Sequence, residues 1–461
     1  MKNVALHNLG CKVNSYELDV IEQDLIENGY NIVPFNEIAD VYIINTCTVT
    51  NIADRKSRQM LHRAKKENPN AIVIALGCYV ETSKKQVEKD PCIDIAVGNN
   101  RKKDVVKILM EYEKQQESCE TSLDENTLTN EKVKTPVMEM DASIEVGSKE
   151  ETKYENMELT NAPEHTRAYI KIQDGCNQFC SYCLIPYARG RIRSREQSDV
   201  VREIEGLAQK GVKEVVITGI HVSSYGLDRG QSEFIELLQK VHEIEGIERI
   251  RLSSLEPRII TQENAKALAS MPKVCPHFHL SLQSGCQSVL ERMNRHYTSS
   301  EYKMCVDILR DVYDKPAITT DVIVGFPGET EEEFEESRAF CEDINFYEMH
   351  VFKYSVRQGT AAARMKDQLT DRQKTERSNV LLNMTKKHSE EYRKLFLGET
   401  VKILWEDIEE INEEKFLVGH NERYVKFAKK VSELKDNEKS GNITSAVATC
   451  LAEDGSIVFV C

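Results

Sequence analysis

Between residues 162 and 360, strand-like and helix-like segments alternate six times, and this alternation limits the fold more than any other feature of the chain. The strand-like runs are AYIKIQDGC, EVVITGIH, RIRLSSLEP, HFHLSLQSG, AITTDVIVGFPG and EMHVFKYSV. Amphipathic stretches of helical length, such as EQSDVVREIEGLAQKG, separate them. Six βα units in a row predict a parallel barrel or part of one, with functional residues at the carboxyl ends of its strands.

The first 110 residues follow a similar rhythm, with strand-like NVALHNLGC, DVYIINTC and AIVIALGC separated by helical stretches. This β-α-β-α-β order predicts an open parallel α/β sheet covered by helices. Cys11, Cys47 and Cys78 each stand where a predicted strand ends. Because the ends of parallel strands meet at one edge, the three thiols are expected to converge there, where such folds bind ligands. The alternative is three ordinary core cysteines.

Changes in composition divide the rest of the chain. Residues 111–160 hold 14 acidic residues against 5 lysines and show little apolar periodicity, which predicts a solvated, partly disordered linker or insertion. After about Gly398, short strands with polar turns predict a small β-barrel of OB-like size. The predicted parts are an N-terminal domain at 1–112, the acidic linker at 113–161, the βα core at 162–392 and the terminal domain at 395–461.

Composition and the N-terminus also indicate where the protein works. There is no run of about 18 apolar residues to span a membrane, and MKNVALHNLGC lacks the apolar core and cleavage site of a secretory signal. We therefore expect a cytoplasmic protein with no membrane contact. Fourteen cysteines in a reducing compartment favour metal binding or catalysis over disulfides. A net charge of −15 argues against a simple nucleic-acid binder.

Three cysteines of one short loop, Cys176, Cys180 and Cys183, directly follow the first strand of the predicted barrel. Their C-x3-C-x2-C spacing supplies three thiolates, and no fourth Cys or His lies nearby in the sequence to complete a zinc site. A [4Fe–4S] cluster normally takes four cysteines, so three would leave one iron open for a substrate or cofactor. A structural metal loop or a chance spacing is the alternative.

This loop, with Tyr182 before its last cysteine and a βα barrel around it, resembles the radical S-adenosylmethionine superfamily. The resemblance implies a cluster whose open iron chelates S-adenosylmethionine and passes it one electron, which releases a 5′-deoxyadenosyl radical. HNLGCKVNSYE, INTCTVT and LGCYVE resemble the N-terminal domain of the methylthiotransferases, and GCNQFCSYCLIPYARGRIRSR, ITGIHVSSYG, LSLQSGC and DVIVGFPGET resemble their radical core. The terminal barrel resembles a TRAM domain, an RNA-binding module.

The resemblance assigns roles to further residues. It implies a second [4Fe–4S] cluster on Cys11, Cys47 and Cys78, which carries the transferred sulfur. Contacts to S-adenosylmethionine are expected from residues of the loop and the strand ends, namely Tyr182, Thr218, Gly219, Gln283 and Gly325. Contacts to RNA are expected from two basic runs, namely Arg189, Arg191, Arg193 and Arg195 beside the loop, and Lys426, Lys429 and Lys430 in the terminal barrel.

The residues after the first cysteine suggest the substrate. Methylthiotransferases act on adenosine 37 of tRNA bearing an isopentenyl or a threonylcarbamoyl group, or on an aspartate of a ribosomal protein. Lys12-Val13-Asn14 resembles the threonylcarbamoyl type, which implies methylthiolation at C2 of N6-threonylcarbamoyladenosine 37. The expected partners are the tRNA anticodon loop, an electron donor such as a flavodoxin or ferredoxin, and a sulfur donor. The alternatives are the other two targets, or a non-catalytic iron–sulfur RNA-binding protein.

Overall fold

The computed structural model describes residues 1–120, 136–139, 153–163 and 166–461, and the chain divides into two compact units. The first unit contains residues 1–161 together with two later segments, 174–177 and 183–195. The second unit contains residues 162–173, 178–182 and 196–461. Cys176 and Cys183 therefore belong to the first unit, and Cys180 belongs to the second.

A six-stranded sheet forms the centre of the first unit, in the order β2-β1-β3-β4-β5-β6, and every neighbouring pair is parallel. Its strands are β1 (Asn3–Asn8), β2 (Asn31–Val33), β3 (Val41–Thr46), β4 (Ile72–Gly77), β5 (Ile95–Val97) and β6 (Val137–Glu139). The central strand β3 is buried along its whole length, as expected for a strand covered on both faces. The predicted open parallel sheet is thus confirmed.

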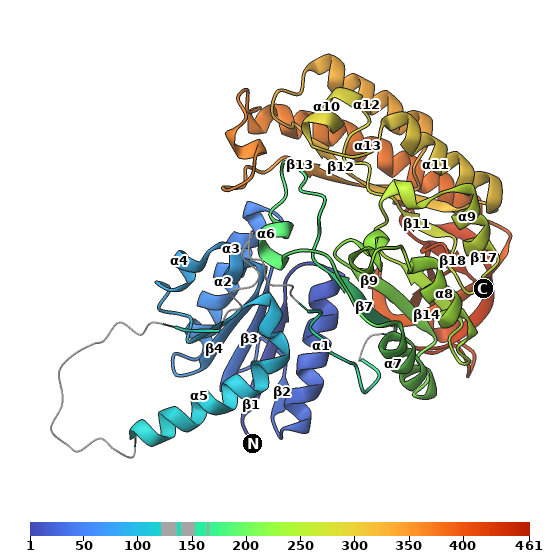
Figure 1. Ribbon diagram of the computed structural model, residues 1–461. Coiled ribbons are helices and arrows are strands. Elements are labelled where there is room, and N and C mark those ends of the chain that lie inside the picture. Colours follow the sequence, from blue (N-terminus) through green and yellow to red (C-terminus); the bar gives the residue numbers. More distant parts are fainter. Residues whose placement is uncertain (121–135, 140–152, 164–165) are drawn as a thin grey trace. The chain divides into compact units, whose positions relative to one another are not determined.

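Helices cover both faces of this sheet (Figure 1). They are α1 (Lys12–Glu27), α2 (Asn51–Glu67), α3 (Cys78–Thr82), α4 (Lys84–Val87) and α5 (Val105–Glu120), with a 3-10 helix at Asn99–Asp104. Leu61 and Ala64 of α2 pack in the same core cluster as Tyr42 of β3. On the opposite face of β3, the Asn45 side chain donates to the Asn14 carbonyl of α1 at 2.9 Å. The later segment of this unit adds α6 (Ile185–Arg189) and β8 (Arg193–Ser194).

The acidic stretch is only partly the solvated linker that its composition predicted. β6 lies within it and adds an edge strand to the sheet, where Val137 pairs with Ile95. Further on, Met157 and Leu159 are buried, and the Met157 carbonyl accepts a hydrogen bond from the Tyr16 hydroxyl of α1 at 2.5 Å. The prediction is wrong for these residues, because short apolar groups within an acidic sequence pack on the sheet and on α1. Residues 121–135 and 140–152 of this stretch lie outside the described residues.

The second unit contains the six parallel strands that the sequence predicted, side by side in chain order as a partial barrel. They are β7 (Ala168–Asp174), β9 (Glu214–Gly219), β10 (Arg249–Leu252), β11 (His277–His279), β12 (Ala317–Val324) and β13 (Glu348–Lys353). A single bridge between Leu255 and Leu280 helps to join the first three strands to the last three. The helices are α7 (Gln197–Gln209), α8 (Phe234–Glu243), α9 (Gln262–Ala269), α10 (Gln287–Arg292), α11 (Ser299–Val312), α12 (Glu331–Ile344) and α13 (Asp371–Lys394).

A small closed barrel follows α13, in the strand order β14-β15-β16-β18-β17. Its strands are β14 (Thr400–Ile411), β15 (Glu414–His420), β16 (Lys426–Lys430), β17 (Ile443–Leu451) and β18 (Val458–Val460). Trp405 is fully buried in its core, and the indole N–H donates to the Thr444 hydroxyl at 2.7 Å. The same core includes Ala317 and Tyr347 of the βα barrel. The predicted β-barrel is thus confirmed, and it is packed against the βα barrel within the second unit.

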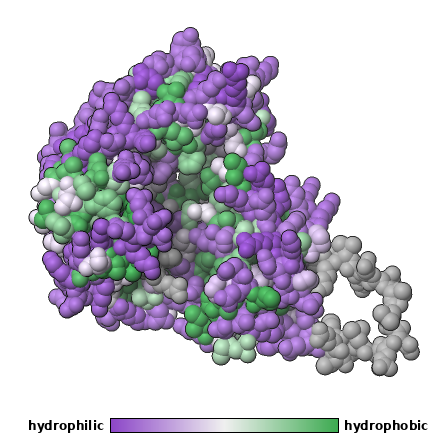
Figure 2. Space-filling model, turned by 180° about the vertical axis from the view of Figure 1, so that it is seen from behind, coloured by the Kyte–Doolittle hydropathy of each residue, from purple (hydrophilic) through white to green (hydrophobic). Residues whose placement is uncertain are grey.

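Hydrophilic residues cover most of the surface seen in Figure 2. This agrees with a chain in which 30% of the residues are charged. No helix among the described residues has the length and apolar character needed to cross a membrane.

Candidate functional site

Cys11, Cys47 and Cys78 lie at the carboxyl ends of three neighbouring strands. Cys11 stands between β1 and α1, Cys47 directly follows β3, and Cys78 begins α3 after β4. Because β3 pairs in parallel with both β1 and β4, the three residues share one edge of the sheet. Burial raises the pKa of the Cys47 thiol to about 12, and the neighbouring Cys78 and Cys11 raise it as well. The predicted convergence of the three cysteines is therefore present in the structure.

The backbone and side chains around these cysteines suit sulfur ligands. The Val49 N–H donates to Cys47 Sγ at 3.5 Å, and Asn99 Nδ2 donates to Cys78 Sγ at 3.7 Å. Gly10 has a φ of +119°, and a Cβ built on it would lie 2.9 Å from the Cβ of Cys47. Glycine is therefore required for the close approach of these two segments. Converging thiols with N–H donors to sulfur are a donor set that fits an iron–sulfur cluster.

Four buried charges meet around Glu17 of α1, in the same unit. The Glu17 carboxylate accepts from Lys102 and, at 2.9 Å, from the Arg189 guanidinium. Arg189 also donates to Asp174 at 3.1 Å and to the Asn14 side chain at 2.8 Å. None of the four charged side chains is more than 3% exposed. Burial acts to lower the pKa of Arg189, but Glu17 and Asp174 outweigh it and hold that pKa well above its ordinary value.

The arginines beside the cysteine loop were predicted to contact RNA, and three of them are buried in the structure. Arg189, Arg193 and Arg195 are buried, each with 3% exposure or less. Carboxylates inside the unit account for the first two, since Arg189 donates to Asp174 and Arg193 Nη2 lies 3.7 Å from it. A buried guanidinium does not reach a phosphate at the surface. Arg191, which is exposed, stays a predicted RNA contact.

The loop of Cys176, Cys180 and Cys183 is also surrounded by donors. Arg295 Nη1 lies 3.3 Å from Cys180 Sγ, and the Ile185 N–H donates to Cys183 Sγ at 3.4 Å. Both groups are N–H donors placed beside sulfur, as the surroundings of a sulfur-ligated metal site require. All three cysteines are half-buried, which keeps them within reach of a ligand. The residues present therefore fit an iron–sulfur cluster held by this loop.

Buried donors close to this loop fit an anionic ligand. The Nε and Nη1 atoms of Arg193 are buried and have no hydrogen-bond partner among the described residues. Buried donors normally have hydrogen-bond partners, so the two unpartnered donors mark a place where a bound anionic group would accept from them.

Gly175 lies where the cysteine loop begins, and its φ is +73°. A Cβ added to it would lie 1.8 Å from the Arg191 carbonyl oxygen. The chain is thus held tightly where the loop begins.

The predicted S-adenosylmethionine contacts occupy the positions that the strand pattern gave them, and their role stays a prediction. Thr218 is buried at the end of β9, and Tyr182 packs edge-on against Phe326 with ring centroids 6.4 Å apart. The other three are Gly219, which ends β9, Gln283, which follows β11, and Gly325, which follows β12. Gln283 has a φ of +70°, an uncommon conformation for a residue other than glycine.

Gly325 has a structural reason to be glycine. Its φ is +71°, and a Cβ there would lie 2.4 Å from the Lys374 side chain. Its N–H donates to Glu329 at 2.7 Å, and that carboxylate accepts from Arg377 at 2.6 Å. The packing of α13 against this turn therefore explains the glycine without any ligand.

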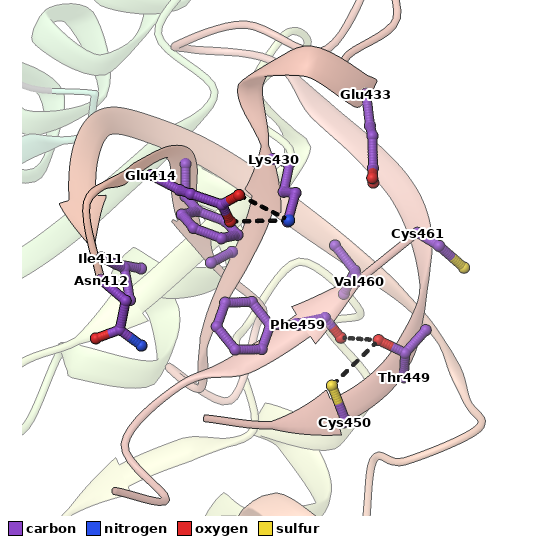
Figure 3. A pocket seen from close by; sticks show the side chains of 12 residues that line it. Ile411, Asn412, Glu414, Lys430, Glu433, Thr449, Cys450, Phe459, Val460 and Cys461 are labelled. Atoms are coloured by element: carbon purple, nitrogen blue, oxygen red, sulfur yellow. Dashed lines mark hydrogen bonds and ion pairs between the residues drawn. The ribbon is translucent and has the colours of Figure 1, made fainter. Parts of the chain in front are cut away.

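Glutamates pair with each of the three lysines that were predicted to bind RNA through the terminal barrel. Lys426 lies 2.7 Å from Glu409, and Lys430 lies 2.8 Å from Glu414. Figure 3 shows the latter pair beside a pocket of the barrel. The side chain of Lys429 is only 3% exposed and is paired at 2.9 Å with a buried carboxylate, Glu438. Ion pairing also reduces what Lys426 and Lys430 offer to a phosphate.

Sequence reasoning missed two parts of the site. Glu17 and Arg295 stand 172 and 115 positions from the groups they contact, Arg189 and Cys180. No local pattern marks either residue, because an isolated charged residue in a helix or loop usually lies on the surface. Only the folded chain identifies them.

Comparisons with known proteins agree with this architecture. The radical SAM superfamily matches residues 170–341, and the uncharacterized protein family UPF0004 matches residues 3–98. A solved structure of the radical S-adenosylmethionine methyltransferase TsrM from Kitasatospora setae aligns with a TM-score of 0.52 at 16% identity, over 76% of this chain and 75% of that chain. This likeness concerns the fold alone.

Sequence relatives extend over nearly the whole chain. The threonylcarbamoyladenosine tRNA methylthiotransferase MtaB of Bacillus subtilis is 39% identical over 94% of this chain and 91% of that protein. The protein of the same name from Aquifex aeolicus is 39% identical over 93% and 98%. The tRNA-2-methylthio-N(6)-dimethylallyladenosine synthase of Opitutus terrae is 35% identical over 88% of each chain. The radical SAM match implies S-adenosylmethionine and a [4Fe–4S] cluster as cofactors. The chain belongs to the tRNA methylthiotransferase family of radical S-adenosylmethionine enzymes.

Proposed function

We propose that this enzyme adds a methylthio group to C2 of N6-threonylcarbamoyladenosine at position 37 of tRNA. The proposal rests on one observation, which is that a single chain carries two separate sets of three cysteines. One set follows the first strand of a βα barrel, and the other converges at the edge of a parallel sheet. Relatives named for threonylcarbamoyladenosine reach 39% identity, which supports this substrate over dimethylallyladenosine.

The residues that suggested the substrate stand next to the cysteines of the sheet edge. Lys12-Val13-Asn14 forms the start of α1, directly after Cys11. The Asn14 side chain donates to the carbonyls of Leu9 at 2.7 Å and Thr46 at 3.1 Å. It therefore ties α1 to the ends of β1 and β3, and a change in this triplet would alter the surroundings of the cysteines.

Two [4Fe–4S] clusters complete the proposed site. Cys176, Cys180 and Cys183 would hold one, and Cys11, Cys47 and Cys78 would hold the other. When bound, the clusters supply the electron that cleaves S-adenosylmethionine and the sulfur that is transferred. The chain itself supplies the cysteine sulfurs, N–H donors to sulfur and a guanidinium group 3.3 Å from Cys180 Sγ.

The proposed partners follow from the electron and the sulfur that each reaction consumes. An electron donor such as a flavodoxin or ferredoxin would reduce the radical cluster, and a sulfur donor would replace the sulfur consumed in each cycle. The nucleic-acid partner is the anticodon loop of tRNA.

Deleting the gene should remove one nucleoside from cellular tRNA. We expect 2-methylthio-N6-threonylcarbamoyladenosine to disappear and its precursor without the methylthio group to accumulate, because the deleted enzyme is the one proposed to form the carbon–sulfur bond. Mass spectrometry of nucleosides from digested tRNA measures both. The wild-type gene should restore the product, and the Cys176→Ala gene should not.

The same strain distinguishes the rival substrates. Loss of a 2-methylthio group from isopentenyladenosine instead would assign the other tRNA substrate, and loss of a methylthio group from a ribosomal protein would assign the protein substrate. An unchanged nucleoside and protein profile would favour an iron–sulfur RNA-binding protein without this activity.

A further inference from the structure

We propose that the exposed face of α2 binds the phosphate backbone of the RNA substrate. This inference rests on the proposed function, since it names the surface on which the tRNA lies. The helix, Asn51–Glu67, holds six basic residues against two acidic ones, in a chain whose net charge is −15. The basic residues are Arg55, Lys56, Arg58, Arg63, Lys65 and Lys66.

Most of these cations gather along a single face. An open groove runs along this face, lined by Arg55, Arg58, Gln59, His62, Arg63 and Lys66. Their spacing of three and four residues repeats the turn of a helix, and the opposite side of α2 is buried through Ser57, Leu61 and Ala64. From Arg55 to Lys66 the face extends roughly 16 Å, a length over which a nucleic-acid strand presents several phosphates.

The cations at the two ends of this face have no carboxylate partner. Across the described part of the chain, no Asp or Glu side chain forms an ion pair with Arg55, Lys56 or Lys66. Arg63 has only the exposed Glu67, at 3.4 Å, and an exposed pair of this kind is weak. In contrast, Lys426, Lys429 and Lys430 of the terminal barrel each have a glutamate partner. Uncompensated positive charge therefore gathers on α2.

The position of the helix connects this charge with the cysteines. α2 begins four residues after Cys47, and its N-cap Thr50 accepts a hydrogen bond from the Ala53 N–H at 3.1 Å. Val49 and Ile52, at this end of the helix, are 59% and 58% exposed. Exposed apolar side chains beside a basic face suit the mixed surface of a nucleic acid, with bases and phosphates side by side. An RNA strand along α2 would lead to the sheet edge that holds the cysteines.

An RNA fits this face better than an acidic protein does. Arg55, Arg58 and Arg63 offer planar guanidinium forks, which match phosphate oxygens in pairs. Gln59 adds a hydrogen-bonding amide between them, and His62 lies 2.9 Å from the Asp90 carboxylate. The regular spacing along one line matches a repeating polyanion.

Two charge-matched variants test the proposal in the full-length, cluster-loaded enzyme. Arg55→Gln with Lys66→Gln removes two cations from the face. Lys107→Gln with Lys114→Gln removes two exposed cations from α5 and gives the same net charge. Binding of an anticodon stem-loop that carries N6-threonylcarbamoyladenosine without the 2-methylthio group is measured by fluorescence anisotropy from 50 to 300 mM KCl. The α2 variant should bind roughly ten- to thirtyfold more weakly near 150 mM salt, and its log–log salt slope should fall by about 1.4–1.8. The α5 variant should match the wild type.

Any other result of the binding experiment contradicts either the proposed function or the assignment of α2 to RNA. If the wild-type enzyme does not bind the stem-loop, the proposed function fails, independently of α2. If it binds and both variants match it, α2 is not the RNA surface. If RNA binding is unchanged while reduction of the α2 variant by an acidic flavodoxin slows, the face belongs to the electron donor and the RNA proposal is overturned.

Discussion

Replacing Cys11, Cys47 and Cys78 together by alanine should remove about half of the iron and all of the methylthiolated product, while cleavage of S-adenosylmethionine continues. The reason is that the three residues share one sheet edge, whereas Cys176, Cys180 and Cys183 remain intact in the loop. Iron and sulfide analysis of the anaerobically reconstituted protein measures the first effect. Chromatographic assays for 5′-deoxyadenosine and for the modified nucleoside measure the other two.

Three buried cysteines elsewhere provide the matched control. Cys275, Cys305 and Cys341 are buried in the second unit, and their replacement by alanine should leave the iron content unchanged. That control also shows what small cavities alone do to the protein. Replacement of Cys176 alone should give the reverse pattern, with loss of S-adenosylmethionine cleavage. Full iron content and normal product in the variant of Cys11, Cys47 and Cys78 would end the assignment of a second cluster.

Arg189→Ala should destabilise the first unit by about 3–5 kcal/mol, because it leaves buried carboxylates without their principal cation. Glu17 would keep Lys102, but Asp174 would lose its 3.1 Å contact and Asn14 its 2.8 Å contact. For a unit of this size, such a loss lowers the midpoint of thermal unfolding by roughly 6–20 °C. Calorimetry on the full chain should show this as an earlier first transition.

Arg191→Ala is the control for this prediction, since it changes an exposed arginine two positions away. Its effect should stay within about 0.5 kcal/mol. A thermal transition of Arg189→Ala that coincides with the wild type would show that the four charges do not depend on one another.

The sequence predicted the parts of the fold that repeat and missed those that are short. Six strands of the βα barrel and the central strands of the first sheet were evident from apolar runs separated by helices. β2, β5 and β6 were missed because each is only three residues long, too short to show a period, and none belongs to a longer strand-like run as the equally short β11 does. β6 was additionally hidden by the acidic residues around it.

The positions of the site cysteines could be predicted from the sequence, because they follow from where the strands end. The burial of charged residues could not, because it depends on contacts between residues far apart in the chain. The cysteines stand at strand ends, so a strand prediction places them correctly. Arg189 was assigned to RNA because it stands in a basic run beside the cysteine loop, and Lys429 because it stands in a basic run of the terminal barrel. Their burial depends on carboxylates brought in by the fold. The basic face of α2 was present in the sequence, but it becomes distinctive only when Lys426, Lys429 and Lys430 prove to be paired.

The charges around Glu17 have a consequence for the order in which the protein is made. Their members come from the first helix, from the 3-10 helix at Asn99–Asp104 and from a segment beyond residue 173. A ribosome that has completed only residues 1–161 has produced the sheet and its three cysteines, but not Arg189. In that nascent chain Glu17 has Lys102 but lacks its hydrogen bonds from Arg189, so the contacts around α1 are not yet complete. The contacts around Glu17 are therefore completed only after the loop with Cys176, Cys180 and Cys183 has left the exit tunnel, which links the folding of the first unit to synthesis of the second cysteine set.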